Sequence, residues 1–203
     1  LTESTPFSAS GRLIFDQPTG KLWSMPLSPP SQPAPLFRLP PGTFAFQPVW
    51  SKAVKKVAYC YIAPDPESGK LQNARLWIAN LDGTNARPAY QPPPDFPGTY
   101  RDPAWSPDGS ELWATVQLPE TDISGVTRFR SEIRRILVSD NLATGSETVI
   151  IKVGRGPAIS PSGRWLAYLS TNPQTDKDDI WRSARDGGES RLLVAGDRFE
   201  EIY

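Results

Sequence analysis

The sequence predicts an all-β protein that is built from a repeated unit. The unit is clearest at residues 102–114 (DPAWSPDGSELWA) and at residues 156–168 (GPAISPSGRWLAY). Each copy has a short run of strand-forming residues, a Ser-Pro-x-Gly turn and a second apolar run. In such a turn Pro fixes φ and Gly accepts a positive φ. A less well conserved match to the unit covers residues 47–59, and a truncated copy covers residues 7–15.

The spacing of the copies indicates the architecture. The serine after the first run of each copy recurs at Ser8, Ser51, Ser106 and Ser160, at intervals of 43, 55 and 54 residues. Repeats of about 40 to 55 residues with several strands each are typical of propeller blades. The sequence therefore predicts a β-propeller with about four recognisable four-stranded blades, which form a complete or a partial propeller.

Composition supports this interpretation. The 203 residues include 23 Pro and 15 Gly, which favour turns over long helices. Seven Trp, six Tyr and eight Phe suit β-strands. No segment of ten or more residues carries a convincing helical period.

The first two blades are predicted at about residues 4–41 and 44–91 of a single domain that spans residues 1–203. After their repeat copies, further strands are expected at 21–25, 34–39 and 74–81. In the last of these strands Leu76 and Ile78 alternate with Trp77 and Ala79, so both faces are apolar. This pattern is typical of a strand between two neighbouring blades.

The third and fourth blades are predicted at about residues 99–152 and 155–196. Their outer strands are expected at 134–139, 147–151, 179–184 and 190–194, with a turn at Asp186-Gly187-Gly188. Residues 197–203 have the pattern of a further inner strand. We expect this strand either to close the ring or to begin another blade.

Two Pro-rich segments and three insertions interrupt the repeats. Residues 26–41 and 87–97 are interpreted as ordered surface connectors with extended backbone. A Pro-rich ligand for an aromatic groove is the alternative. The insertions, at 64–73, 119–132 and 172–177, all fall between the second and third strands of a blade. We therefore expect them on one face of the disc.

Several classes of function are disfavoured by composition. The 22 basic and 22 acidic residues give no net charge, whereas a nucleic-acid-binding protein usually has a basic surface. The sequence has no His, which excludes a Ser-His-Asp triad or a His-ligated zinc within this chain. It also has no Gly-x-Ser-x-Gly or phosphate-binding Gly-rich motif. We expect no catalytic residue, no cofactor and no nucleic-acid partner.

Other candidate sites are explained by the fold. Cys60 is the only cysteine and lies in an apolar run, so we expect a buried, unreactive thiol. Asp176, Asp178 and Asp179 are a candidate calcium site, but a solvated turn is favoured. No metal is therefore assigned. No apolar run approaches the ~18 residues that a membrane span needs.

The repeat resembles that of TolB-type β-propellers. The resemblance rests on the Pro-x-Trp-Ser-Pro-Asp-Gly unit, the following apolar strand, an Ile/Leu-Trp pair and an Asp-Gly-Gly turn. It implies an extracytoplasmic (periplasmic or secreted) binding platform. Related propellers also gate the substrates of serine peptidases whose catalytic residues lie in a separate domain. Such propellers commonly have six or more blades. Three alternatives follow: residues 197–203 close a small ring, a homo-oligomer completes it, or the chain is a piece of a longer protein.

The resulting hypothesis is a non-catalytic platform that binds a protein or peptide. A substrate-gating domain of a serine peptidase is the first alternative, and a carbohydrate-binding propeller is the second. Residues next to each inner-strand proline should lie around the axis. The candidate axial surface consists of Phe46, Gln47, Tyr100, Arg101, Asp102 and Arg155, beside Gly156. The alternative is that these residues only fill a narrow central channel.

Overall fold

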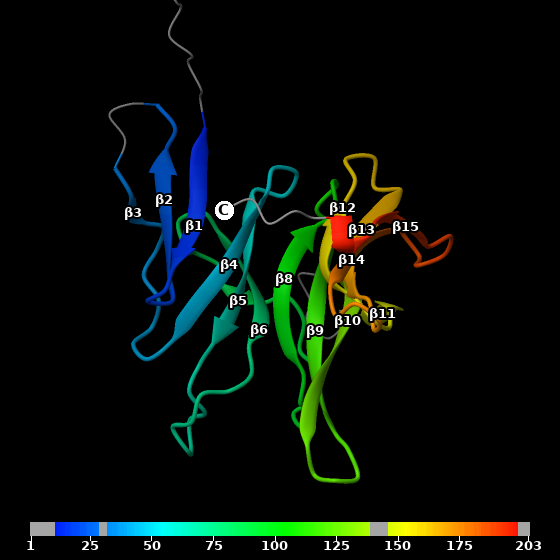
Figure 1. Cartoon of the computed structure of the whole chain (residues 1–203). Coiled ribbons are helices and arrows are strands. Elements are labelled where there is room, and N and C mark those ends of the chain that lie inside the picture. Colours follow the sequence, from blue (N-terminus) through cyan, green and yellow to red (C-terminus); the bar gives the residue numbers. More distant parts are fainter. Residues whose placement is uncertain (1–10, 29–31, 139–145, 199–203) are drawn as a thin grey trace, which may run out of the picture.

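The computed structural model describes residues 11–28, 32–138 and 146–198. In this part of the chain fifteen strands form four antiparallel sheets, which are arranged as a four-bladed β-propeller (Figure 1). A short 3-10 helix at Gly196–Arg198 is the only helix in the described segments. The predicted all-β propeller fold is thus confirmed.

The first sheet contains β1 (Arg12–Gln17), β2 (Lys21–Pro26) and β3 (Ala34–Pro35). Its expected inner strand, near Phe7, lies outside the described residues. The outer strand was expected to reach Leu39, but β3 has only two residues. Pro33 and Pro35 have no backbone N–H to donate to a ladder, which explains the shorter pairing.

The other three sheets have four strands each, and neighbours in the chain are neighbours in the sheet. The second sheet consists of β4 (Phe44–Ser51), β5 (Lys56–Ile62), β6 (Arg75–Asn80) and β7 (Arg87–Pro88). The third consists of β8 (Thr99–Trp105), β9 (Glu111–Thr121), β10 (Thr127–Leu137) and β11 (Glu147–Ile151). The fourth consists of β12 (Arg155–Ile159), β13 (Trp165–Thr171), β14 (Asp178–Ala184) and β15 (Arg191–Val194).

The repeated turns form as the sequence predicts. The N–H of Gly109 donates to the carbonyl of Ser106 at 2.8–2.9 Å, as the N–H of Gly163 does to the carbonyl of Ser160. Both glycines have a positive φ, of 75° and 70°. The strands on either side of each turn therefore pair as a hairpin.

The structure corrects the interpretation of residues 119–132 as an insertion between two strands. Most of it is not a loop, because β9 and β10 stay paired from Glu111 with Leu137 to Thr121 with Thr127. The extra residues instead lengthen a hairpin that extends well beyond its sheet in Figure 1, on the same side as the loop at residues 63–74.

Apolar side chains fill the space between successive sheets. Leu22 packs with Val57 and Tyr59 between the first and second sheets. Ala58, Cys60 and Leu112 belong to the cluster between the second and third sheets, and Trp113, Ile133 and Leu166 to that between the third and fourth. The two middle sheets therefore bury both faces.

The four sheets lie side by side in chain order, with the first and fourth at the two ends of the row (Figure 1). No strand of the fourth sheet makes an extended contact with a strand of the first within the described segments. Among those segments, no helix is long and apolar enough to cross a membrane.

Candidate functional site

Each inner strand of the last three sheets carries a β-bulge at the residue before its proline. The pairing register shifts between Phe46 and Val49 in β4, between Arg101 and Ala104 in β8, and between Arg155 and Ala158 in β12. At these bulges Gln47, Asp102 and Gly156 have positive φ angles of 53°, 51° and 60°. Bulges re-aim side chains locally, and here they do so at one equivalent position in three blades.

A chain of hydrogen bonds connects these three bulges. The Gln47 Nε2 donates to Asp102 Oδ1 at 2.6 Å, and the backbone N–H of Asp102 donates to Gln47 Oε1 at 2.9 Å. The Thr115 hydroxyl donates to Asp102 Oδ2 at 2.9 Å and accepts the N–H of Gly156 at 2.9 Å. Polar groups of the inner strands and of the adjacent strand β9 thus join the second, third and fourth sheets.

The predicted axial residues therefore divide into distinct environments. Gln47 and Asp102 belong to this hydrogen-bond chain, while Phe46 packs against the core between the second and third sheets. Tyr100 is buried, and its hydroxyl donates to Glu147 at 2.6 Å. Burial raises the pKa of Tyr100 well above its usual range, so the phenol stays protonated as a donor.

Two of the predicted residues, both arginines, lie nearer to solvent. Arg101 is exposed, and its Nε donates to Gln117 Oε1 at 2.8 Å. Arg155 is partly buried and forms an ion pair with Asp178. Gln117 and Arg155 line one cavity. The axial region therefore adjoins this cavity, through Gln117 beside Arg101 and through Arg155 itself.

This cavity lies between the β9–β10 hairpin and the fourth sheet and has a volume of about 570 Å³. Volumes of this size are typical of ligand sites. Its walls combine apolar and cationic side chains, including Phe129, Val153, Arg128 and Arg155. The Phe129 side chain is 69% exposed and that of Val153 is 59% exposed. We call this feature the hairpin cavity.

Ion pairs stiffen the hairpin wall. Arg130 pairs with Glu120 at 2.5 Å across the two strands and also with Glu132. The hydrogen bond that Arg130 donates to Glu120 is the largest cause of the raised pKa of Arg130. Arg134 continues the series to Glu132 and Glu147, both at 2.8 Å. Two of these pairs bridge strands, because Arg130 with Glu120 joins β10 to β9 and Arg134 with Glu147 joins β10 to β11.

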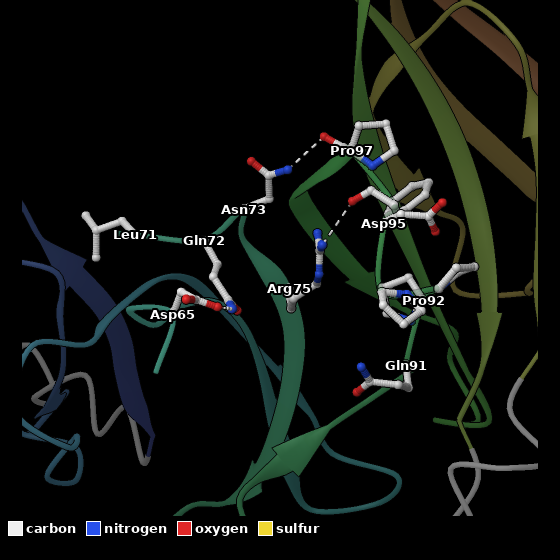
Figure 2. Close-up of a pocket in the computed structure, with 12 residues that line it drawn as sticks. Asp65, Leu71, Gln72, Asn73, Arg75, Gln91, Pro92, Asp95 and Pro97 are labelled. Atoms are coloured by element: carbon white, nitrogen blue, oxygen red, sulfur yellow. Dashed lines mark hydrogen bonds between the residues drawn. The ribbon is translucent and has the colours of Figure 1, made fainter. Parts of the chain in front are cut away.

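A second cavity, of about 650 Å³, lies between the loop at residues 63–74 and the Pro-rich connector (Figure 2). Four of its polar side chains are already engaged within the protein. Asn73 donates to the carbonyl of Pro97, Arg75 donates to the carbonyls of Phe96 and Gly98, and Gln72 donates to Asp65. These bonds hold the connector in place, as its interpretation as an ordered connector requires.

The sequence did not identify the residues that line the hairpin cavity, except for Arg155. Phe129 and Val153 lie in segments that were interpreted as an insertion and as a connection between blades. No local pattern singled these two residues out, because isolated exposed apolar residues are common on protein surfaces.

The described segments contain no cluster of candidate metal ligands. No group of three or more His, Cys, Asp or Glu side chains gathers there. Asp178 pairs with Arg155, and Asp179 accepts from the N–H of Gly196 and from Asn172. Cys60 is buried, and burial raises the pKa of its thiol far above the usual range.

No family model matches the sequence, and no curated protein matches it. Solved structures do. A chain from a nidogen/laminin complex has 18% sequence identity and a TM-score of 0.61, over 93% of this chain and 62% of that chain. A puromycin-hydrolyzing peptidase of Mycobacterium tuberculosis has 18% identity and a TM-score of 0.53, over 85% of this chain and 28% of that chain.

The β-propeller domain of the Trilobed protease from Pyrococcus furiosus has 17% identity and a TM-score of 0.51, over 82% of this chain and 47% of that chain. The present chain thus spans less than two thirds of each of these three structures. At such identities the likeness concerns the propeller fold.

Proposed function

We propose that this chain is a non-catalytic propeller platform that binds a protein or peptide at the hairpin cavity. The observation that supports the proposal is the pairing of an open cavity with exposed Phe129 and Val153 and with arginines on its rim. Aromatic and arginine side chains contribute most to protein-binding energy. The ion pairs of the hairpin reduce the ordering that binding would otherwise cost.

The chemistry of the rim defines the partner class. An apolar side chain of the partner fills the space beside Phe129, and an acidic group approaches Arg128, since Arg130 and Arg155 already pair with carboxylates of the chain. The resemblance of the repeat to TolB-type propellers supports both a binding role and a location outside the cytoplasm. The nidogen/laminin structure shows that a similar fold occurs in a protein complex.

The test is selection of a random peptide library, displayed on phage, against the immobilised full chain. We expect enriched peptides that combine an apolar and an acidic residue. The variant Phe129→Ser should weaken their binding by at least about tenfold. Leu71→Ser is the matched control, since Leu71 is also exposed but lines the other cavity. Failure to enrich any peptide, or loss of binding only in Leu71→Ser, would contradict the proposal.

A second candidate is a propeller that gates a serine peptidase domain. It is favoured by the similarity to two peptidase structures, of which this chain spans 28% and 47%. This candidate predicts a domain with a Ser nucleophile and a His in the same gene product. Sequencing the transcript on both sides of this coding region tests it. The carbohydrate-binding alternative stays a prediction, and a glycan array with the same chain tests it.

A further inference from the structure

The outer edge of strand β10 is unpaired in the projecting part of the β9–β10 hairpin (Figure 1). β11 pairs with β10 only between Ile133 and Ile136. One backbone contact follows on this side, from the N–H of Gly154 to the carbonyl of Ser131 at 3.0 Å. Residues 127–129 lie beyond that contact, and no strand of the described segments runs along their outer side. We call residues 127–129 the open edge.

The pairing of the hairpin shows which backbone groups the open edge presents. In an antiparallel ladder, successive residues direct their N–H and C=O groups alternately toward the partner strand and away from it. The carbonyl of Ser131 points away from β9, because it accepts from Gly154. Phe129 and Thr127 follow the same alternation, so their N–H and C=O groups also point away from β9. These groups are placed to bond an added strand.

The two outer edges of the hairpin differ in their donors. Pro119 lies opposite Phe129, at the equivalent outward position of β9, and it has no N–H. A proline on an edge strand is a common protection against unwanted pairing. The open edge of β10 has no proline and keeps both N–H groups. It borders the hairpin cavity, whose lining includes Phe129, Ser131 and Gly154.

The side chains beside the open edge specify the strand that fits. Phe129 lies on the same face of β10 as Ile133, whose side chain packs between the third and fourth sheets. Directly opposed residues of a ladder project to one face, so a residue opposite Phe129 points into the hairpin cavity. An apolar side chain suits this position. The next residue projects to the other face, beside the exposed Arg128, where an acidic side chain is favoured.

We propose that an extended segment of a partner protein, with alternating apolar and acidic residues, adds a strand to the open edge. This inference rests on the proposed function and states how the partner of the hairpin cavity is held. Backbone groups of Thr127 and Phe129 bond the segment along its length, and alternate side chains enter the cavity. In strand addition generally, main-chain bonds give affinity and pockets for alternate side chains give specificity.

Charge favours such a partner over a second copy of this chain. Two open edges that pair antiparallel can place Phe129 opposite Phe129 or opposite Thr127 of the second copy. The first register places Arg128 opposite Arg130, and the second places it opposite Arg128. Like charges directly opposite one another destabilise a ladder. An acidic residue of a different chain avoids this repulsion.

The test is binding of a fluorescein-labelled octapeptide of alternating Val and Glu to the full chain, measured by fluorescence anisotropy. Two matched peptides carry N-methyl groups either on the two central Val residues or on the two central Glu residues. An added strand directs only alternate N–H groups at β10. One N-methylated peptide should therefore bind at least about tenfold more weakly, while the other keeps the affinity of the parent. Equal affinities of the two, or no binding of the parent peptide, would overturn the proposal.

Substitutions at Phe129 separate this inference from the proposed function. Phe129→Ser removes the aromatic ring and keeps the N–H, whereas Phe129→Pro removes both. Pro119 directly opposite shows that the hairpin accommodates proline at this position. We expect Phe129→Pro to bind the parent peptide about tenfold more weakly than Phe129→Ser.

The outcomes of this comparison are distinct. Equal binding by the two variants would overturn strand addition and leave the hairpin cavity as the site. Weakened binding in Phe129→Pro alone would support strand addition and contradict the role of the aromatic ring in the proposed function. Analytical ultracentrifugation checks the occupant, because a wild-type dimer that Phe129→Pro dissociates would make the occupant a second copy and overturn the proposal.

Discussion

The side-chain amide of Gln47 makes two hydrogen bonds to Asp102, one to its carboxylate at 2.6 Å and one from its backbone N–H at 2.9 Å. Both residues precede the proline of an inner strand, one in the second sheet and one in the third. The next contact differs, because the shorter Asp102 reaches Gly156 only through Thr115. Cys60 occupies the position equivalent to Thr115 in the second sheet, with its Sγ 3.5 Å from Gln47 Oε1.

This difference predicts a compensating pair of substitutions. Gln47→Asn should shorten the acceptor without adding a charge beside Asp102, leave the N–H of Asp102 unpaired and lower the free energy of unfolding by about 1–3 kcal/mol. Adding Cys60→Thr supplies the hydroxyl that bridges the next contact, so the double variant should recover part of the loss. Urea unfolding measures both values. If the two effects simply add, the proposed equivalence of the contacts is wrong.

The hydrogen bond and the ion pair of Glu147 predict different losses of unfolding free energy for different substitutions. Glu147 accepts from Tyr100 at 2.6 Å and pairs with Arg134 at 2.8 Å. Glu147→Ala leaves both groups without this acceptor and should cost about 3 kcal/mol of unfolding free energy. Tyr100→Phe removes one hydrogen bond and should cost about 1 kcal/mol. Denaturant unfolding of both single variants and the double variant gives the coupling, and the double variant should lose less than the sum.

Asp108 predicts a pH-dependent contribution to stability. Its Oδ1 accepts from the Ser106 hydroxyl at 2.6 Å and from the N–H and hydroxyl of Ser110. These bonds, that from Ser106 above all, lower the pKa of Asp108 to about 2. The unfolded pKa is about 3.9. A lowered folded pKa stabilises the protein above about pH 4, and this contribution disappears as the pH falls toward about 2.

The corresponding variant is Asp108→Asn, which should be less stable than the wild type at neutral pH, and the difference should shrink toward zero as the pH falls through about 2. Thermal unfolding across this range measures the difference. Ser162, which occupies the same position in the turn at residues 160–163, provides the control. Ser162→Ala should have an effect that does not change with pH. A constant difference for Asp108→Asn would contradict the assigned charge effect.

The reactivity of the buried Cys60 thiol should report on unfolding. Burial first, and then the nearby carboxylate of Asp102, raise its pKa, so almost no thiolate is present in the folded protein. A thiol reagent at about pH 8 should leave the native chain unmodified and label it fully in concentrated guanidinium chloride. Mass spectrometry counts the adducts. Rapid labelling of the native chain would mean that the contact between the second and third sheets opens readily.

Much of the fold was predictable from the sequence because the repeat has strong local chemistry. The turns at Ser106–Gly109 and Ser160–Gly163 depend on Pro and Gly within four residues, so they could be located without tertiary information. The outer strands were less predictable. Pairing of β3 and β7 stops after two residues, because Pro33, Pro35 and Pro88 limit the available donors.

The candidate site was less accessible to sequence reasoning than the fold. Residues beside the inner-strand prolines were expected near the axis, but the roles of Gln47 and Asp102 depend on distances between sheets. The hairpin cavity was missed because strands β9 and β10 continue past the point where the repeat pattern ends. The position of Phe129 follows from that extended pairing, which has no local signature.

The bulge contacts have a consequence for how the blades are ordered. In each contact the backbone N–H of the later sheet donates to a side chain of the earlier one. The acceptor is on the inner strand in one case, at Gln47, and on the neighbouring strand in the other, at Thr115. Shuffling the second and third sheets in a rearranged gene would separate each acceptor from its donor. The blades share a repeat, yet they are not interchangeable. Their side chains specify which blade lies next to which.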